Sequence, residues 1–548
     1  MDKTEKGFTP RSIESTTRNW GILGRVDPSV FLISAIVCVG FTVWGVIDNE
    51  GLGTVVGNAL TWSIDTLGWL YMSAVFFFVI FVLFMAFSRY GRVRFGTAED
   101  KPEYKNFSWF SMLFGCGMGV GLIFWSVAEP MYHYLSGPTY AGKPGSVQAA
   151  EWSMAISFFH WGISAWAVFV VVGIAMGIII HKKGLPALIS SCFYPILGDR
   201  IYGPIGKAID IITLVATFFG MCTTIGLGTM QLTSGLHWNW DSIPINNTTY
   251  FIVLAVVTAG YLASATLPIE KGIKTGSNAS MIATLGLMAF LVIVGPTIFI
   301  FNNFFNATGI YLQNFPTMSL WLDPVAKTGW LGSWTIFYWA WWIAWAPFVG
   351  IFIAKISKGR SVREFVLAAL LAPTLFSMVF FSIFGSSAIA QQLDKATGGA
   401  LYTAIQADVS SAIFVMFEKY PLSGVVGIVL LFVVYTFFVV SADSCTIVLG
   451  MLSSGGTEDP KTAIKLLWGV AMAVSAGVLL AMSGLAALQT ASIVAALAFT
   501  VIMLFLAYAT VKMVRVDYAH ELESGSVQTY VPAEPAAAVA EGSGTSQD

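Results

Sequence analysis

Charge is what this sequence has least of. Only 11% of its 548 residues are Asp, Glu, Lys or Arg, and 56% are hydrophobic, whereas soluble globular proteins carry about 25% charged residues. A long chain with so little charge is not a soluble enzyme, a disordered protein or a fibre. The 28 basic and 30 acidic residues nearly balance, so there is no basic surface for a nucleic acid. The class that remains is a polytopic membrane protein.

Residues that carry out catalysis are also scarce. The chain has five histidines and five cysteines, and the cysteines show neither disulfide pairing nor metal-ligand spacing. It contains no HExxH, CxxC or GxSxG motif and no phosphate-binding loop. We therefore predict no enzymatic activity, no cofactor and no metal.

Long apolar runs are abundant instead. A helix needs about 20 apolar residues to cross a bilayer core of about 30 Å. Twelve runs qualify, which predicts an all-α integral membrane protein with twelve transmembrane helices. They are 28–48, 66–89, 108–134, 150–181, 208–236, 249–268, 279–301, 334–356, 364–390, 423–451, 464–485 and 489–513.

The distribution of basic residues predicts the orientation. With the N-terminus inside, 24 of the 28 lysines and arginines fall on cytoplasmic segments, and only Lys143, Lys327, Lys395 and Lys419 lie outside. This asymmetry follows the positive-inside rule and places both termini in the cytoplasm.

The chain divides into three parts. A cytoplasmic segment, 1–27, precedes the membrane domain, 28–515, and a tail, 516–548, follows it. The tail has six acidic residues and no lysine or arginine, so we expect it to be disordered. Between the seventh and eighth spans, 302–333 carries aromatic and aliphatic residues at partly helical spacing. We expect an amphipathic helix there, along the outer membrane face.

Two spans carry helix-breaking residues at mid-membrane depth. Four glycines alternate from Gly115 to Gly121 in the third span, and Pro347 lies in the eighth. Close packing through small residues also explains a glycine patch, but freed backbone groups in lipid are tolerated where they line a cavity. Interrupted helices at corresponding places in two halves indicate the midplane site of a transporter. Helices 3–7 (108–301) and 8–12 (334–515) are therefore predicted to be inverted five-helix repeats, with two additional N-terminal helices.

Tryptophans cluster at the same depth. Trp341, Trp342 and Trp345 share faces of the eighth span, and the fourth span has Trp161 and Trp166. Such rings can form a cage for a quaternary ammonium group, with up to about 2 kcal/mol per desolvated contact. Interfacial or packing roles explain tryptophans near span ends, but they explain this mid-span group poorly.

At these residues the sequence resembles the betaine/choline/carnitine transporter family. The most specific similarity runs from Trp339 to Phe365, with further matches at Gly117–Gly121, Glu129-Pro130, Phe159–Gly162 and Ser441–Ser444. The resemblance implies a LeuT-type fold, a homotrimer in the lipid of the bacterial inner membrane, and alternating-access transport of quaternary ammonium compounds or related osmolytes.

The resemblance also implies a substrate site. The aromatic box carries over to Trp161, Trp166, Trp341, Trp342 and Trp345, with Phe169 where betaine carriers often have a tyrosine. Tyr132 matches a box tyrosine of carnitine-type members. Met118, Gly119 and Gly121 lie in the glycine run, and Gly121 replaces an aspartate of some choline carriers, which favours a zwitterion.

The coupling positions depart from those of sodium-driven members. One ion site would involve Gly115, Met118, Phe437, Val440 and Ser441, but Val440 replaces an expected threonine. A second would use Thr217, but its partner position is Met221, a poor ligand for a hard cation. Lys274 occupies the position of an arginine in sodium-independent members, although it also fits an ordinary positive-inside charge.

These departures predict transport without sodium, by exchange or proton coupling. We also place Phe348 and Asp443 among the coupling positions; Asp443, Glu129 and Asp210 are the intramembrane acids that could carry a proton, or serve structure alone. A sodium-coupled betaine symporter, or a carrier of a sulfonium compound or ectoine, are the alternatives.

Overall fold

The computed structural model describes residues 16–517 except 98, 270, 395–398 and 484. The described chain is almost entirely helical, and its only sheet pairs β1 (Arg18–Asn19) with β2 (Arg25–Val26). Eleven helical segments are long and apolar enough to span a membrane, and one of them, Val147–Lys183, consists of two consecutive helices. The bent pair Asn106–Gly117 and Gly119–Ser136 brings the number within the described residues to twelve. The predicted all-α membrane fold with twelve spans is thereby confirmed. The inverted relation between its two halves stays a prediction.

The long helices follow the predicted order of spans, with α11 as an additional helix that is not among the candidate spans. They are α1 (Pro28–Ile47), α2 (Asn49–Phe87), the pair α3 (Asn106–Gly117) and α4 (Gly119–Ser136), the pair α5 (Val147–Trp161) and α6 (Ile163–Ile178), α8 (Pro204–Asn239), α9 (Asn247–Ala265), α10 (Ile273–Val294), α11 (Thr297–Leu320), α12 (Phe337–Lys355), α13 (Val362–Leu393), α16 (Ser423–Ser453), α17 (Thr462–Ser483) and α18 (Leu485–Asp517).

Short helical turns connect these helices. They are η2 (Gly21–Leu23), η3 (Arg89–Arg92), η4 (Thr139–Ala141), η5 (Ile179–Lys183), η6 (Ser190–Phe193), α7 (Tyr194–Leu197), η7 (Gly198–Tyr202), η8 (Gly332–Ile336), α14 (Ala400–Ala407), η9 (Val409–Ser411) and α15 (Ala412–Phe417).

The third span is broken where the glycine run predicted. α3 ends at Gly117, α4 begins at Gly119, and the two helices are bent by 66°. Met118 lies between them with φ −151° and ψ −1°, outside helical geometry. Glycine lowers helix propensity by about 1 kcal/mol relative to alanine, so four glycines favour a break here.

The predicted interruption of the eighth span is wrong. α12 runs through Pro347 without a break, and the irregular turn η8 precedes it instead. A proline removes one backbone donor, and here the flanking residues keep the helix continuous because the whole segment from Phe337 to Ala354 is buried among neighbouring helices.

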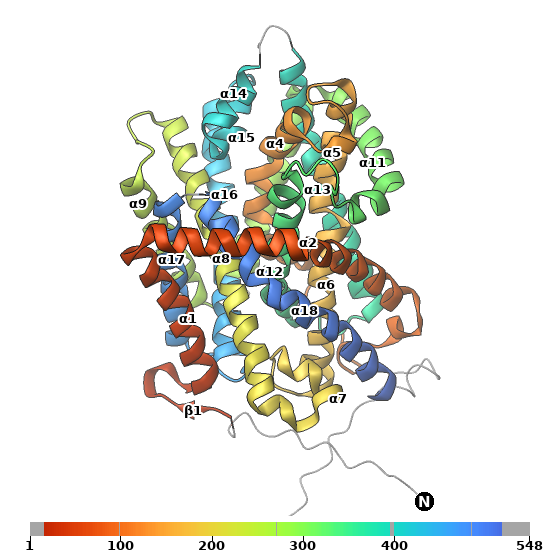
Figure 1. Cartoon of the computed structure of the whole chain (residues 1–548), viewed down its shortest axis with the longest axis vertical. Helices are drawn as coiled ribbons and strands as arrows, with labels where there is room; N and C mark the ends of the chain where they lie inside the picture. Colours follow the sequence, from red (N-terminus) through yellow and green to blue (C-terminus); the bar gives the residue numbers. More distant parts are fainter. Residues whose placement is uncertain (1–15, 98, 270, 395–398, 484, 518–548) are drawn as a thin grey trace, which may run out of the picture.

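The second span is longer than predicted. α2 begins at Asn49, not near residue 66, and Figure 1 shows it crossing the width of the molecule. The side chain of Asp48 accepts a hydrogen bond from the Gly51 N–H (2.9 Å) and so caps the helix there. The sequence did not predict this extension because glycines and polar residues lower the hydropathy of 49–65.

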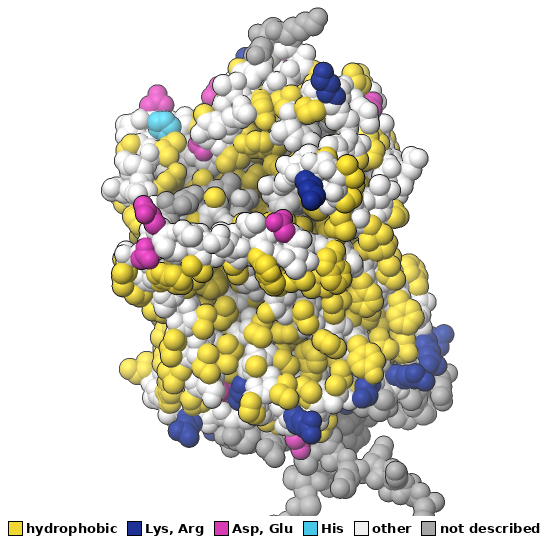
Figure 2. Space-filling view, in the orientation of Figure 1, with side chains coloured by type: hydrophobic (Ala, Val, Ile, Leu, Met, Phe, Trp, Pro, Cys, Tyr) yellow, Lys and Arg dark blue, Asp and Glu magenta, His cyan; other side chains and the backbone are white. Residues whose placement is uncertain are grey.

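α12 forms the centre around which the other helices are arranged (Figure 1). It packs against α6, α8 and α18, and α4 and α5 lie beside it through the ring contacts described below. On the face drawn in Figure 2, hydrophobic side chains form a broad band, and lysines and arginines gather below it. The helix α11, which covers part of 302–333, packs against α5 and α13 and exposes Phe301, Phe305 and Leu312.

Candidate functional site

The tryptophans of α12 meet Trp161 at the end of α5. Trp341 and Trp342 stack with ring centroids 4.8 Å apart, and Trp345 lies 5.6 Å from Trp341. Trp161 stands edge-on to Trp342 at 4.9 Å and to Trp341 at 6.2 Å. All four side chains are fully buried. The structure therefore brings these predicted box residues into one cluster, which we call the tryptophan cluster.

Phe169 and Trp166 extend the cluster along α6. The Phe169 ring lies 6.0 Å from Trp342 and 5.5 Å from Trp166. The indole nitrogens of Trp166 and Trp341 have no hydrogen-bond partner within the described chain. Phe169 thus contributes a ring to the cluster, without the hydroxyl group that a tyrosine would bring.

The broken helix approaches the cluster through its glycines. A Cβ atom built at Gly121 would lie 2.8 Å from Cη2 of Trp161 and 2.9 Å from Cη2 of Trp341. A Cβ at Gly117 would lie 2.9 Å from Cη2 of Trp166, and one at Gly119 would lie 2.5 Å from the Phe437 ring. Met118 is buried at the break between them. The glycine run is what lets the backbone of α3 and α4 touch these rings.

The cluster is closed in this conformation. Its neighbouring ring centroids lie 4.8–6.2 Å apart, which is the range of direct aromatic contact. A trimethylammonium group between two rings needs both faces free, so the rings must separate before such a ligand can enter.

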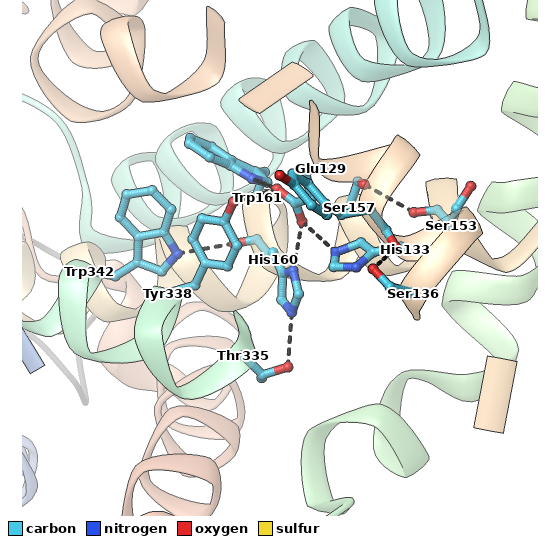
Figure 3. A network of polar contacts seen from close by, with 11 residues as sticks. Glu129, His133, Ser136, Ser153, Ser157, His160, Trp161, Thr335, Tyr338 and Trp342 are labelled. Atoms are coloured by element: carbon cyan, nitrogen blue, oxygen red, sulfur yellow. Dashed lines mark hydrogen bonds and ion pairs between the residues drawn. The ribbon is translucent and has the colours of Figure 1, made fainter. Parts of the chain in front are cut away.

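A buried carboxylate lies next to the cluster (Figure 3). Glu129 of α4 accepts hydrogen bonds at Oε2 from Nε1 of Trp161 and from the hydroxyl of Tyr338, both at 2.6 Å. Its Oε1 lies 2.7 Å from Nδ1 of His160 and 3.1 Å from Nε2 of His133. All five side chains are fully buried. The carboxylate thus joins α4, α5 and α12.

The network continues on both sides of His160. Its Nε2 lies 3.0 Å from the hydroxyl of Thr335, and its backbone carbonyl accepts a hydrogen bond from Nε1 of Trp342 at 3.0 Å. Two tryptophans of the cluster are therefore oriented by one polar network.

Glu129, His133 and His160 are also residue types that bind metal ions. One ligand atom each of Glu129, His133 and His160 lies within 4.8 Å of the others. Glu129 Oε1, His133 Nε2 and His160 Nδ1 are joined to one another by hydrogen bonds, whereas Nδ1 of His133 has no partner within the described chain. We therefore interpret the group as a hydrogen-bond network and not as a metal site.

Tyr338 and Thr335 were not predicted from the sequence to belong to the site. They precede Trp342 by four and seven residues, so helical spacing places all three on one side of the eighth span. Likewise, His133 follows Glu129 by four residues. These spacings were available signals, but only the packing of three helices shows that they converge on one carboxylate.

Tyr132 lies in different surroundings. Its ring contacts Trp334 at 5.5 Å and Tyr402 at 5.7 Å, and it is only partly buried. Among the ring contacts of the described residues, none joins Tyr132 to the tryptophan cluster.

The first set of coupling positions surrounds the broken helix. The Ser441 hydroxyl donates to the Gly115 carbonyl at 2.9 Å. Val440 lies next to α3 and α10. A Cβ built at Gly115 of α3 would be 3.6 Å from its Cγ1, and a Cβ built at Gly276 of α10 would be 3.0 Å from its Cγ2. Phe437 packs 6.1 Å from Phe114. An apolar side chain thus occupies the place of the expected threonine.

The second set lies on α8 and α12. Thr217 and Met221 are one turn apart on α8, both are buried, and the Thr217 hydroxyl has no hydrogen-bond partner in the described chain. Between them, the Gly220 carbonyl accepts a hydrogen bond from Nε1 of Trp345 at 3.0 Å. The Phe348 ring lies 5.1 Å from Trp345. These positions therefore adjoin the tryptophan cluster.

Lys274 and Asp443 have separate partners. Nζ of Lys274, in the first turn of α10, lies 5.7 Å from the centroid of the Tyr104 ring. Asp443 accepts a hydrogen bond from the Ser264 hydroxyl at one oxygen, and its other oxygen has no partner within the described residues.

The long apolar helices, one of them broken beside an aromatic cluster, define a multi-pass membrane protein. Residues 29–519 match the model of the betaine/carnitine/choline family of transporters, and the chain belongs to this family. Because its members are membrane carriers, the expectation that the chain is not an enzyme is confirmed.

Relatives with assigned names share most of their length with this chain. It is 44% identical to a probable glycine betaine transporter of Desulfitobacterium hafniense, over 89% of this chain and 98% of the relative. It is 42% identical to the glycine betaine transporter OpuD of Bacillus subtilis, over 87% and 92%. An ectoine/hydroxyectoine transporter of Virgibacillus pantothenticus is 37% identical, over 87% and 94%.

Proposed function

We propose that this protein is a secondary carrier that takes up glycine betaine or a similar quaternary ammonium zwitterion by alternating access. The observation that carries the proposal is the cluster of Trp161, Trp341, Trp342 and Trp345, held against the glycines of a broken helix. Desolvated tryptophan faces bind quaternary ammonium groups without a direct ionic partner. The names of the relatives in Desulfitobacterium and Bacillus support betaine as substrate.

Ectoine is the second candidate substrate. The Virgibacillus relative is named as an ectoine/hydroxyectoine transporter and matches nearly all of its length. An aromatic cluster also accepts the delocalised cation of ectoine, and it would accept a sulfonium compound by the same contacts. Competition against betaine uptake separates these substrates from carnitine and choline.

We further propose that transport does not require sodium and runs by exchange or by proton coupling. Na⁺ is a hard cation that needs oxygen ligands, whereas the side chains of Val440 and Met221 offer no oxygen. The Ser441 hydroxyl and the Gly115 carbonyl are hydrogen-bonded to each other at 2.9 Å, which supports a site that closes without an ion. A sodium-coupled symporter of the same family is the alternative.

The test is uptake of labelled glycine betaine into liposomes containing the purified protein, with external sodium replaced by potassium. We expect uptake to persist, and preloading with betaine or imposing a pH gradient then distinguishes exchange from proton symport. The matched variant is Val440→Thr combined with Met221→Thr, which restores two oxygens. We expect this variant to respond to sodium. Loss of wild-type uptake without sodium would overturn the coupling proposal and leave the substrate proposal intact.

The assembly and location follow the family. We propose a homotrimer in the bacterial inner membrane, with both termini in the cytoplasm. The exposed apolar side chains of α11, Phe301, Phe305 and Leu312, face lipid or a neighbouring subunit in this arrangement.

A further inference from the structure

Glu129 is a buried acid with no lysine or arginine beside it in the described part of the chain. Among the described residues, its ion-pair contacts are the imidazoles of His133 and His160, and neither a lysine nor an arginine contacts it. Two of its four hydrogen-bonding groups, the Trp161 indole and the Tyr338 hydroxyl, are neutral donors. Both imidazoles can also donate in a neutral tautomer. Four donors around a carboxylate stabilise its ionised form against the cost of burial. In that form the site holds a negative charge with no lysine or arginine beside it among the described residues.

This charge is one hydrogen bond away from the tryptophan cluster. The Trp161 indole donates to Glu129 at its nitrogen, and the far side of its six-membered ring lies next to Gly121. The same indole stands roughly perpendicular to the rings of Trp341 and Trp342. A hydrogen bond to an anion polarises the donor, and such polarisation is strong where water is excluded. The indole ring becomes more electron-rich, which strengthens its attraction for a cation over its face.

We propose that Glu129 is the electrostatic positioning residue of the substrate site: through Trp161 it fixes the cluster and supplies the counter-charge for a substrate ammonium group. The inference rests on the proposed function and adds a determinant of specificity to it. A buried unpaired charge is unfavourable, and the bound ammonium supplies the missing positive charge. Glu129 itself does not contact the substrate.

Charge and packing roles are separated by a pair of isosteric ligands. Glycine betaine and 3,3-dimethylbutanoate have the same shape, and the latter has a neutral carbon in place of the ammonium nitrogen. The experiment measures the inhibition of labelled betaine uptake, and ligand-induced tryptophan fluorescence, for both compounds in full-length protein. The preference is the ratio of the two affinities.

Glu129→Gln retains the size of the side chain and removes the charge. We expect it to lower the betaine affinity by about tenfold, as for loss of a desolvated cation–π contact, and to leave the affinity for 3,3-dimethylbutanoate unchanged or improved. The preference therefore falls. Thr335→Val, at the outer end of the network, retains the carboxylate and is expected to retain the preference. Glu129→Asp retains the charge and is expected to restore part of it.

A second variant keeps the test decisive if Glu129→Gln does not fold. Tyr338→Phe keeps the ring that stacks on Trp342 but removes the hydroxyl that donates to Oε2 of Glu129, so the ionised carboxylate is less stabilised and the preference should again fall. An equal loss of affinity for both compounds, or an unchanged preference, would overturn the role of Glu129. Failure of the wild-type protein to bind betaine at all would instead overturn the proposed function.

Discussion

At the scale of single residues, the lack of a side chain at Gly121 allows two tryptophan rings to approach the backbone of the broken helix closely. A methyl group there would lie 2.8 Å from Trp161 and 2.9 Å from Trp341, closer than van der Waals contact allows. Because the rings are held by neighbours on all sides, they can only move by disturbing the cluster. Overpacking of this kind costs about 1–3 kcal/mol.

We expect Gly121→Ala to reduce betaine affinity by roughly tenfold, or about 1.4 kcal/mol, because the methyl group would occupy space next to Trp161 and Trp341 that the substrate needs once the rings separate. Concentration-dependent uptake in liposomes measures the effect. Gly286→Ala is the matched control, because a Cβ at this exposed position of α10 has no heavy atom within 4 Å. Unchanged affinity in Gly121→Ala would show that the substrate binds away from this part of the cluster.

At the scale of elements, α3 is attached to the loop between α12 and α13 by Arg360. The guanidinium carbon lies 3.7 Å from the centroid of the Trp109 ring, and Nη2 donates to the Tyr104 carbonyl and the Asn106 side chain. The Trp109 indole donates in turn to Ser357 at 3.0 Å. A planar guanidinium satisfies all these contacts together, which an ammonium group cannot do.

Arg360→Lys should therefore lower stability by about 1–3 kcal/mol through loss of stacking and charge-assisted hydrogen bonds. A maleimide dye measures this during heating, because all five cysteines are buried and react only when the protein unfolds. Lys358→Ala is the comparison. The Lys358 side chain is 47% exposed, and its Nζ lies 3.4 Å from Oδ1 of Asp100, so the loss of this exposed ion pair should change stability little. Equal losses of stability in the two variants would contradict the role of Arg360 in holding α3 to the loop between α12 and α13.

Helix interruptions show what could be predicted from sequence at this scale. Four glycines lower helix propensity repeatedly within one run, and the break at Met118 lies inside that run. Pro347 affects a single donor, and α12 continues through it because burial on every side decides its geometry. The start of α2 at Asn49 was missed because its first turns contain glycines. Local composition therefore predicts strong interruptions well, and tertiary packing decides the weaker ones.

The site shows the same division between local pattern and packing. The tryptophans could be identified from their spacing because residues three or four apart share a helix face. The role of Tyr338 could not, because it depends on how α12 meets Glu129 of α4 across 209 positions of sequence. Contacts of this kind arise only when separate helices pack together.

At the scale of the whole molecule, the fold fixes which ends of the helices share a side of the membrane. Figure 1 shows β1 and the end of α18 at the same lower end of the molecule, where Figure 2 shows lysines and arginines gathered. Twelve spans return the chain to the side from which it started. Since basic residues are retained on the cytoplasmic side, this lower end is predicted to face the cytoplasm.

Reporter fusions on either side of α9 test this orientation. We expect alkaline phosphatase, which is active only outside the cytoplasm, to be active when fused at Pro244 and inactive at Lys271, and green fluorescent protein to show the opposite pattern. These positions flank one 19-residue helix, so they must lie on opposite sides if α9 spans the membrane. The reverse pattern would show that the molecule has the opposite orientation in the membrane. The same reporter active at both positions would show that α9 does not span the membrane. The first result would contradict the charge argument alone, and the second would contradict the twelve-span fold on which it depends.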